Sequence, residues 1–461
     1  MAFIIVLAAL VFLMFVAYRG YSVILFAPVA ALLAVLFTDP AQVLPMFSGV
    51  FMDKMVGFVK NYFPVFMLGA IFGKVIELSG FSKSIVSAVI HIVGERRAML
   101  SIVVVCAILT YGGVSLFVVV FAVYPFAAEM FRQGNIPKRL IPGTIALGAF
   151  TFTMDSMPGT PQIQNIIPTT FFNTNTYAAP WLGILGSIFI LVVGLAYLEW
   201  RRRAAAAKGE GYGTNLLNEP EPYEEERLAN PWIAILPLFV VGILNKVFTV
   251  MIPRFYGETA TIAIPGHPIT MKVSALAAIW AVEGALLVGI LTVIAFAWKP
   301  VIAKFAEGTK AAVAGSLLAS MNTASEYGFG GVIAALPGFV VVADALRAIP
   351  NPLVNEAITV TTLAGITGSA SGGMSIALAA MADDFIKAAQ SAGIPLEVFH
   401  RVAAMASGGM DTLPHNGAVI TLLAVTGLTH RTSYQDIFAV TIIKTAAVFV
   451  VIAFYYLTGL Y

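Results

Sequence analysis

The apolar residues of this chain fall into blocks of about 16 to 25 positions, separated by short polar segments. A helix of this length crosses a hydrocarbon core about 30 Å thick. The blocks predict membrane-spanning helices near residues 2–18, 21–37, 62–79, 139–171, 181–199, 231–252, 273–297, 326–343, 397–428 and 434–459. The first block has no basic flank and no small-residue cleavage site, so we expect a span and not a signal peptide. The expected fold class is an all-α polytopic membrane protein.

Two further apolar stretches, residues 98–131 and 354–391, are interrupted near their middle by small residues. The interruptions read Tyr111-Gly112-Gly113-Val114-Ser115 and Gly368-Ser369-Ala370-Ser371-Gly372-Gly373. Such residues mark turns, so each stretch is predicted to be a re-entrant helical hairpin. Segments 43–60 and 299–321 carry charges on an otherwise apolar helical pattern, which predicts amphipathic helices lying at the membrane interface.

The chain reads as a duplication around a hydrophilic linker at residues 201–230. Motifs recur about 258 positions apart. Gly112-Gly113-Val114-Ser115 matches Gly372-Gly373-Met374-Ser375, and Met154-Asp155-Ser156-Met157-Pro158 matches Met410-Asp411-Thr412-Leu413-Pro414. We therefore predict a first repeat over residues 1–200 and a second over residues 231–461.

The two repeats are expected to have inverted topology. Each has about five predicted spans, an odd number, so the second copy must enter from the opposite side. If both termini lie outside and the loop at 200–230 is cytoplasmic, most of the 26 lysines and arginines lie inside, as the positive-inside rule requires. This indicates a multi-pass protein of a bacterial-type inner (cytoplasmic) membrane, in contact with the lipid bilayer.

The composition excludes several classes of protein. With 59% hydrophobic and 11% charged residues, the 461-residue chain cannot cover a water-facing surface. Soluble enzymes and nucleic-acid-binding proteins are thereby excluded, and the net charge of +2 suggests no polyanionic partner. Cys106 is the single cysteine, so there is no internal disulfide. The histidines are isolated in sequence, and we predict neither a metal site nor a cofactor.

Prolines and glycines break two of the predicted spans. Pro158, Gly159 and Pro161 interrupt the span at 139–171, and a Gly- and Pro-rich stretch interrupts the span at 397–428. Unwound backbone at membrane depth is tolerated only inside protein or beside a water-filled cavity. Transporters built from inverted repeats bind their substrates at such breaks. The two breaks are therefore predicted to line one cavity of a secondary active transporter.

Helix N-termini and neutral hydrogen-bond donors gather at the breaks and at the hairpin tips. Both suit the carboxylate and hydroxyl groups of a small organic anion. The candidate substrate-binding residues are Gly112, Gly113, Ser115, Ser156, Gly159, Thr160, Gln162, Asn165, Ser369, Ser371, Gly372, Gly373, Thr412, His415 and Asn416. The alternative for any one of them is that a small residue only permits close helix packing.

Four titratable residues are candidates for proton coupling. Asp155 and Asp411 occupy equivalent places in the two copies, and carboxylates inside a membrane usually mark ion or proton pathways. His415 lies in the second break and can titrate near neutral pH, and Glu326 has several polar neighbours in sequence. The alternative for the two aspartates is that they cap the half-helices that follow them.

Three motifs resemble the gluconate permease (GntP-type) family of proton/organic acid symporters, within a wider ion-transporter superfamily. They are Phe72-Gly73-Lys74-Val75-Ile76-Glu77-Leu78-Ser79-Gly80, the tip Gly368-Ser369-Ala370, and His415-Asn416 in a Gly-rich break. Their order agrees along nearly the whole chain. Pro158-Gly159-Thr160-Pro161 also resembles the helix-breaking loop of dicarboxylate carriers in that superfamily. The resemblance implies a homodimer, a scaffold domain, and a transport domain that moves elevator-fashion to import a hydroxy-carboxylate with protons.

Two departures place the chain in a divergent branch of that family. The tip Thr110-Tyr111-Gly112-Gly113-Val114-Ser115 lacks the acidic residue of gluconate permeases, and Met157-Pro158-Gly159-Thr160-Pro161 lacks their histidine. These losses favour a smaller, less hydroxylated acid than gluconate, such as 3-hydroxybutyrate, glycerate or lactate, and a gluconate-like acid stays among the candidates. The alternative is a sodium-coupled carrier of citrate-like or dicarboxylate anions. No protease-like pattern surrounds either aspartate, so we expect no enzymatic activity.

Overall fold

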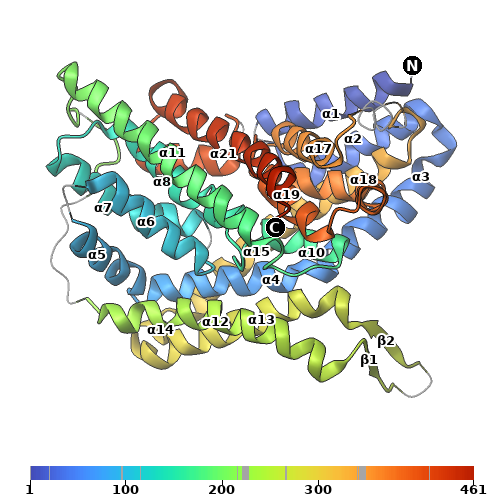
Figure 1. Cartoon of the computed structure of the whole chain (residues 1–461), viewed down its shortest axis with the longest axis horizontal. Helices are drawn as coiled ribbons and strands as arrows, with labels where there is room; N and C mark the ends of the chain where they lie inside the picture. The colour runs from blue at the N-terminus through green and yellow to red at the C-terminus, as the bar shows by residue number, and fades with distance from the viewer. Residues whose placement is uncertain are drawn as a thin grey trace.

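Helices make up almost all of the described chain, as the apolar blocks predict (Figure 1). The computed structural model describes residues 2–19, 21–94, 97–114, 116–214, 216–220, 228–264, 267–339, 341, 349–414 and 416–461. Ser115 and His415, two of the candidate binding residues, lie outside the described residues.

The described part of the first half contains eleven α-helices and three short helical turns. The helices are α1 (Ala2–Tyr18), α2 (Val23–Thr38), α3 (Val43–Pro45), α4 (Met52–Leu78), α5 (Phe81–Val93), α6 (Ala98–Tyr111), α7 (Leu116–Gln133), α8 (Ile141–Ala149), α9 (Phe152–Asp155), α10 (Ile163–Phe172) and α11 (Pro180–Ala207). The turns are η1 (Pro40–Gln42), η2 (Met46–Phe51) and η4 (Lys138–Leu140).

The described second half contains nine α-helices and a β-hairpin. The helices are α12 (Pro231–Tyr256), α13 (Val273–Phe296), α14 (Trp298–Ala303), α15 (Phe305–Ala335), α17 (Pro352–Thr367), α18 (Ala370–Ala392), α19 (Leu396–Ser407), α20 (Gly417–Thr426) and α21 (His430–Thr458). Strands β1 (Thr259–Ile262) and β2 (Ile269–Lys272) pair antiparallel, with Thr259 opposite Lys272. This hairpin between α12 and α13 is a departure from the all-helical expectation.

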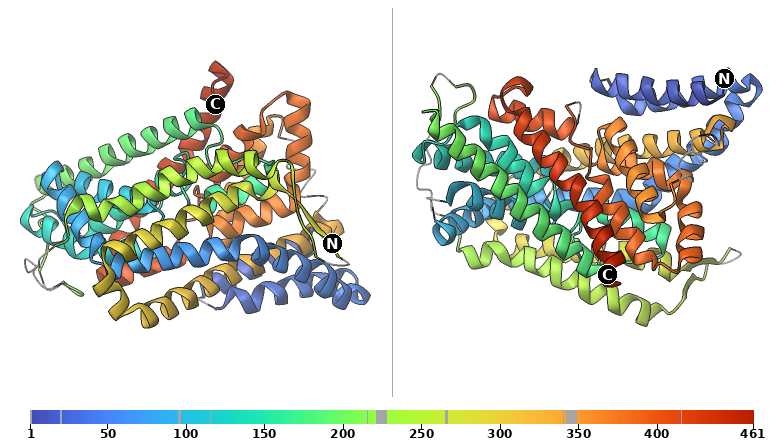
Figure 2. Two further views of the ribbon diagram at one scale, coloured as in Figure 1. Left: turned by 90° about the horizontal axis from the view of Figure 1, so that it is seen from below. Right: turned by 45° about the horizontal axis from the view of Figure 1, so that its top comes forward.

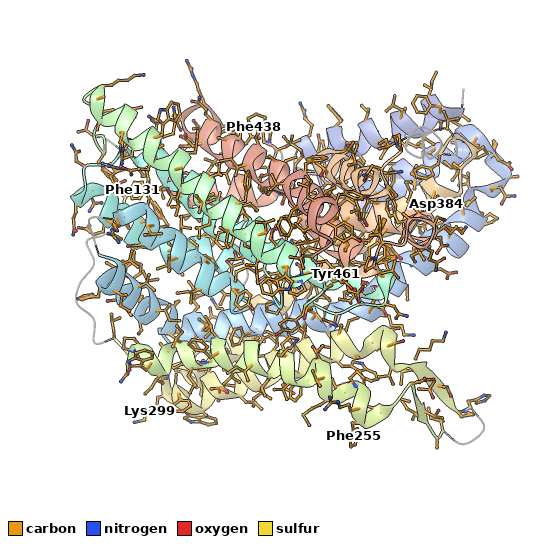
Figure 3. All side chains as sticks on the ribbon, viewed as in Figure 1. Phe131, Phe255, Lys299, Asp384, Phe438 and Tyr461 are labelled. Carbon is orange, nitrogen blue, oxygen red and sulfur yellow. The ribbon has the colours of Figure 1, made fainter. Side chains whose placement is uncertain are left out.

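Five helical segments of the described chain are long and apolar enough to cross a membrane. They are Pro40–Leu78, Pro180–Ala207, Pro231–Tyr256, Val273–Phe296 and His430–Thr458. Large apolar side chains also face outward, as expected of surfaces that contact lipid. Phe255 on α12 and Phe438 on α21 are examples, with 80% and 40% of their surface exposed (Figure 3).

The segments at 43–60 and 299–321, predicted as separate helices at the membrane interface, are not separate, because each runs into a longer helix. Residues 52–60 are the first turns of α4, and residues 305–321 are the first turns of α15. Charged side chains lower the hydropathy of these segments, so the spans predicted at 62–79 and 326–343 begin only after them. The backbone hydrogen bonds of a helix continue through such charges, and α4 and α15 pack along each other.

The chain reverses direction at two tips and unwinds at two places inside the predicted spans. Gly113 (φ +96°) turns the chain between α6 and α7, and Gly368 (φ +64°) turns it between α17 and α18. Positive φ is readily adopted only by glycine. The backbone is non-helical between α9 and α10, and again between α19 and α20.

Helix α4 crosses the middle of the molecule (Figure 1). It packs against α13 on one side, where α12 and α13 form an outer layer, and against α15 along its length. On the other side, α8 packs against α6 and α21, and α21 packs against α11. Helix α1 lies along an outer edge, beside α2 and α17 (Figure 2). The unwound segments are therefore enclosed by helices of both halves.

Candidate functional site

The broken helices of the two repeats touch where Asp155 meets Gly408. Asp155 ends α9, and Gly408 follows α19. A Cβ atom at position 408 would lie only 1.8 Å from Asp155 Oδ2. Only glycine permits this approach of a carboxylate to the backbone.

The Asp155 side chain is 1% exposed and only partly hydrogen-bonded. Its Oδ1 accepts a hydrogen bond of 2.7 Å from Ser156 Oγ. Its Oδ2 has no hydrogen-bond partner among the residues that the structure describes. Buried polar atoms are normally satisfied, so the open oxygen marks this carboxyl group as a place where a proton, ion or ligand atom can be accommodated.

Asp411 occupies the equivalent place in the second copy, and it has a partner. Lys444 Nζ on α21 lies 2.5 Å from Asp411 Oδ1, and both side chains are buried. Lys444 also donates to the carbonyl oxygen of Phe150, at the end of α8. This ion pair therefore joins the second break to the first half of the chain.

The proposed capping role of the two aspartates is wrong. The cap of α20 is Asn416, whose Oδ1 accepts a hydrogen bond of 2.8 Å from Val419 N. Helix α10 begins after Gln162, whose side chain makes no capping hydrogen bond. Asp155 and Asp411 stand too early in their breaks to cap the helices that follow.

Two charged or titratable residues on α19 clamp the first break, and the sequence interpretation missed both. The Arg401 guanidinium is fully buried and donates to Ala178 O through Nε (3.1 Å) and Nη2 (2.8 Å), and to Asn165 Oδ1 through Nη1 (3.0 Å). His400 contacts Asn165 Oδ1 through Nε2 (3.2 Å) and Thr174 Oγ1 through Nδ1 (2.6 Å). The sequence feature that points to them is a histidine and an arginine inside the span predicted at 397–428.

Several candidate binding residues of the first break brace their own loop. Thr160 Oγ1 donates to Thr153 O (2.7 Å), and Asn165 Nδ2 donates to Thr160 O (3.0 Å) and Thr176 O (2.8 Å). Gly159 has a φ of +81°, and its N–H donates to Thr176 O. In this conformation these groups hold the unwound backbone in shape, as buried loops require.

The tip of the first hairpin lies against this loop and against the outer layer. Gln162 Nε2 donates to Thr110 O (2.7 Å). A Cβ on Gly112 would lie 2.4 Å from Leu238 Cγ on α12, and one on Gly113 would lie 3.3 Å from Leu286 on α13 and from Pro161. The structure thus brings Gly112, Gly113 and Gln162 together.

The tip of the second hairpin lies against the second break. Asn416 Nδ2 donates to Gly368 O (2.8 Å). Ser369 Oγ caps α18 by accepting from Gly372 N (3.0 Å), and Gly373 N–H donates to Ser369 O. Thr412, the other described candidate of this break, pairs its hydroxyl with Thr441 Oγ1 (2.6 Å).

Glu326 faces this second tip from α15. A Cβ on Gly372 would lie 1.6 Å from Glu326 Oε2, so glycine is required for this approach too. Glu326 is 3% exposed, and its Oε2 has no hydrogen-bond partner among the described residues. The hydroxyls of Ser371 on α18 and Thr323 on α15 also form a hydrogen bond between these two helices (3.2 Å). The structure places Glu326 at the second tip and Asp155 at the crossing of the breaks, in two separate clusters.

Comparison with known proteins finds a close relative in sequence and a distant neighbour among solved structures. No protein-family model matches the chain. The chain is 60% identical over 471 residues to "Uncharacterized transporter YxjC" of Bacillus subtilis (strain 168), and the match covers 100% of both proteins. The crystal structure of the Alcanivorax borkumensis YdaH transporter, described as having an unusual topology, is similar with a TM-score of 0.54. That match covers 91% of this chain and 90% of the YdaH chain at 15% identity, so it shows a shared fold alone.

Proposed function

Because this chain belongs to the family of the uncharacterized transporter YxjC, we propose that it is a secondary active transporter that imports a small hydroxy-carboxylate together with protons. The expected substrates are acids such as 3-hydroxybutyrate, glycerate or lactate. We place the family as a divergent branch of the gluconate permease (GntP-type) group, on the motifs described above. The expected location is a bacterial-type inner membrane, with both termini outside.

The open carboxylate oxygen of Asp155 at the crossing of the two breaks carries the proposal of proton coupling. An ionised carboxylate that is buried with an unpartnered oxygen is costly, whereas a protonated one has no net charge. Asp411 differs, because Lys444 balances its charge. We therefore assign proton binding and release to Asp155, and we assign a structural ion pair to Asp411.

Substrate binding is proposed where the hairpin tips approach the breaks. Helices α18 and α20 both begin there, with Ser369 and Asn416 as their caps. The backbone N–H groups at a helix start attract a carboxylate. A change in charge at Asp155 would alter how the two breaks pack, and so couples the proton to the geometry of the substrate site.

Alternating access is proposed to follow an elevator-type movement of one part of the chain against another. The moving part would contain the hairpins α6–α7 and α17–α18 and the broken helices α8–α10 and α19–α20. Helices α4, α12, α13 and α15 would belong to the stationary scaffold of a homodimer. The division is supported by the direct contacts of each tip with its own break, through Gln162 in the first copy and Asn416 in the second.

Sodium coupling is the second candidate, and a specific observation favours it. Helices α15 and α18 carry buried side-chain oxygen atoms without a hydrogen-bond partner among the described residues. They are Ser320 Oγ, Ser325 Oγ, Glu326 Oε2 and Ser375 Oγ. Hard cations prefer such all-oxygen surroundings.

Uptake into proteoliposomes decides between the two candidates. Purified protein is reconstituted, and labelled 3-hydroxybutyrate, lactate, glycerate and citrate are offered under an inward proton gradient without sodium. The same acids are then offered under an inward sodium gradient at equal pH on both sides. Proton-driven accumulation of a monocarboxylate supports the proposal. Accumulation only under the sodium gradient favours the second candidate, and no uptake of any acid overturns both.

A further inference from the structure

A polar cavity of about 260 Å³ lies between α4, α10 and α15, apart from the breaks and the tips. Its walls include Lys54, Asn61 and Tyr62 from α4, Thr170 and Phe171 from α10, and Tyr327 from α15. These three helices meet near the centre of the molecule (Figure 1). The volume is that of about nine water molecules at roughly 30 Å³ each, which accommodates a small organic acid.

One end of the cavity is suited to an anion. Lys54 is the one cation among the lining residues, and its ammonium lies 5.8 Å from the centre of the Tyr327 ring. Among the described residues, no carboxylate oxygen lies within 4.0 Å of Lys54 Nζ, and the Asn61 amide makes no hydrogen bond. An ammonium and an amide donor therefore remain available to a carboxylate and a hydroxyl group.

The rest of the cavity is aromatic, and ring contacts and hydrogen bonds hold its walls together in this conformation. The Tyr327 ring lies 5.8 Å from the Phe58 ring and 6.1 Å from the Phe171 ring, centre to centre. Tyr62 fastens this wall to α10, because its hydroxyl donates to Ile167 O (3.2 Å) and pairs with the Thr170 hydroxyl. Preformed apolar walls with a few polar groups are typical of small-molecule sites.

We propose that this cavity is an additional binding site for small monocarboxylates, at which the substrate is held before it reaches the breaks. The inference rests on the proposed function for the identity of the acid. Asp53 also lines the cavity and is exposed. The single ammonium of Lys54 can pair with one carboxylate, whereas the solvent-screened charge of Asp53 repels a second one. The cavity thereby selects monocarboxylates over dicarboxylates and citrate.

Charge-selective labelling of an introduced cysteine tests the site without any ion gradient. Cys106 is buried and is replaced by alanine. Gly57→Cys places a thiol in the cavity wall and leaves the proposed ligand contacts in place, because nothing lies within 4 Å of a Cβ atom there. The detergent-purified protein is treated with an anionic and a cationic methanethiosulfonate, and each rate is divided by that for a free thiol.

We expect the anionic reagent to react several-fold faster than the cationic one, and Lys54→Gln to abolish that preference. Lys60→Gln is the matched control, since Lys60 is an exposed lysine on the same helix that does not line the cavity. 3-Hydroxybutyrate or lactate should slow labelling several-fold relative to chloride, and citrate should not.

Three results would overturn the site: equal effects of Lys54→Gln and Lys60→Gln, no protection by either monocarboxylate, or equal protection by citrate. Proton-driven uptake with no protection would remove the cavity site and leave the proposed function intact. Protection without proton-driven uptake would support the cavity site and overturn the proposed proton-coupled transport.

Discussion

The ammonium of Lys444 and the carboxylate of Asp411 form a buried ion pair that links α21 to the break of the second repeat. Asp155, the counterpart in the first repeat, has no such cationic partner among the residues that the structure describes. Helix α11, the counterpart of α21, carries no charged residue before Glu199. The duplicated aspartates therefore have different surroundings, and their replacements should have different effects.

Breaking the Lys444–Asp411 pair should destabilise the protein. Removing one partner of a buried pair leaves an uncompensated charge and typically costs about 3–5 kcal/mol. Asp411→Asn and Lys444→Met should each lower the unfolding temperature in detergent, and the double variant should recover most of the loss. Lys74→Met, which removes an exposed pair with Glu77, is the control and should change little. Additive losses in the double variant would contradict an energetic pair.

Asp155→Asn should uncouple transport from the proton gradient. The amide keeps the size of the side chain and cannot take part in proton exchange. We expect accumulation of labelled acid under an inward proton gradient to fall at least tenfold, while exchange of labelled for unlabelled acid persists. Unchanged gradient-driven accumulation by this variant would mean that another residue binds the proton, and Glu326 would be the next candidate.

Gly372→Ala should disturb the second hairpin through Glu326. The added methyl group would lie 1.6 Å from Glu326 Oε2, and overpacking typically costs about 1–3 kcal/mol. The double variant Gly372→Ala/Glu326→Ala removes the obstructing carboxyl group and should regain thermal stability. Gly315→Ala on α15, the helix of Glu326, has open space around it and serves as the control. A double variant no more stable than Gly372→Ala would show that the clash is not the cause.

Arg401→Lys should weaken the clamp on the first break, although the charge is kept. Lysine cannot reproduce the planar fork that reaches Ala178 O and Asn165 Oδ1 together. Each buried acceptor left without its donor costs about 1–3 kcal/mol. We expect a lower unfolding temperature and slower uptake, with Arg431→Lys at an exposed position unchanged. If Arg401→Lys keeps full activity and stability, the positive charge at this position is sufficient and the hydrogen bonds of the guanidinium are not required.

Acid should release part of the linker from the helices that it contacts. The hydrogen bond from the Arg139 guanidinium lowers the pKa of Glu210 below its usual value. A lowered pKa means that this contact stabilises the folded linker above the unfolded value of about 4.3, and that the contribution is lost as the pH falls through the folded value. Proteolysis within residues 208–220 should therefore accelerate between about pH 5 and pH 3, and Glu210→Gln should show fast cleavage already at pH 7.

The sequence predicts the helical membrane fold well, because the length and composition of apolar blocks depend only on local residues. The chain does turn at Gly113 and Gly368 and unwinds near Pro158 and Pro414, since glycine and proline act through their own backbone. The length of α4 was not predicted, because its charged first turns look like the end of a span.

Pairwise contacts were beyond the reach of sequence reasoning. Lys444 was visible as a lysine inside a span, but its distance from Asp411 along the chain conceals their contact. The approach of Gly408 to Asp155 depends on how two breaks cross, which no single segment encodes. Arg401 was overlooked because a charge near the start of a predicted span resembles a boundary residue.

The single lysine on α21 has a consequence for the side of the membrane to which the resting protein opens. If the two halves were chemically identical, exchanging their roles would turn the inward-facing molecule into the outward-facing one, and both forms would have equal free energy. Lys444 breaks this equivalence, because only one half carries the neutralised aspartate. The resting protein should therefore favour one side of the membrane, and Asp411→Asn/Lys444→Met should move that bias toward an even distribution.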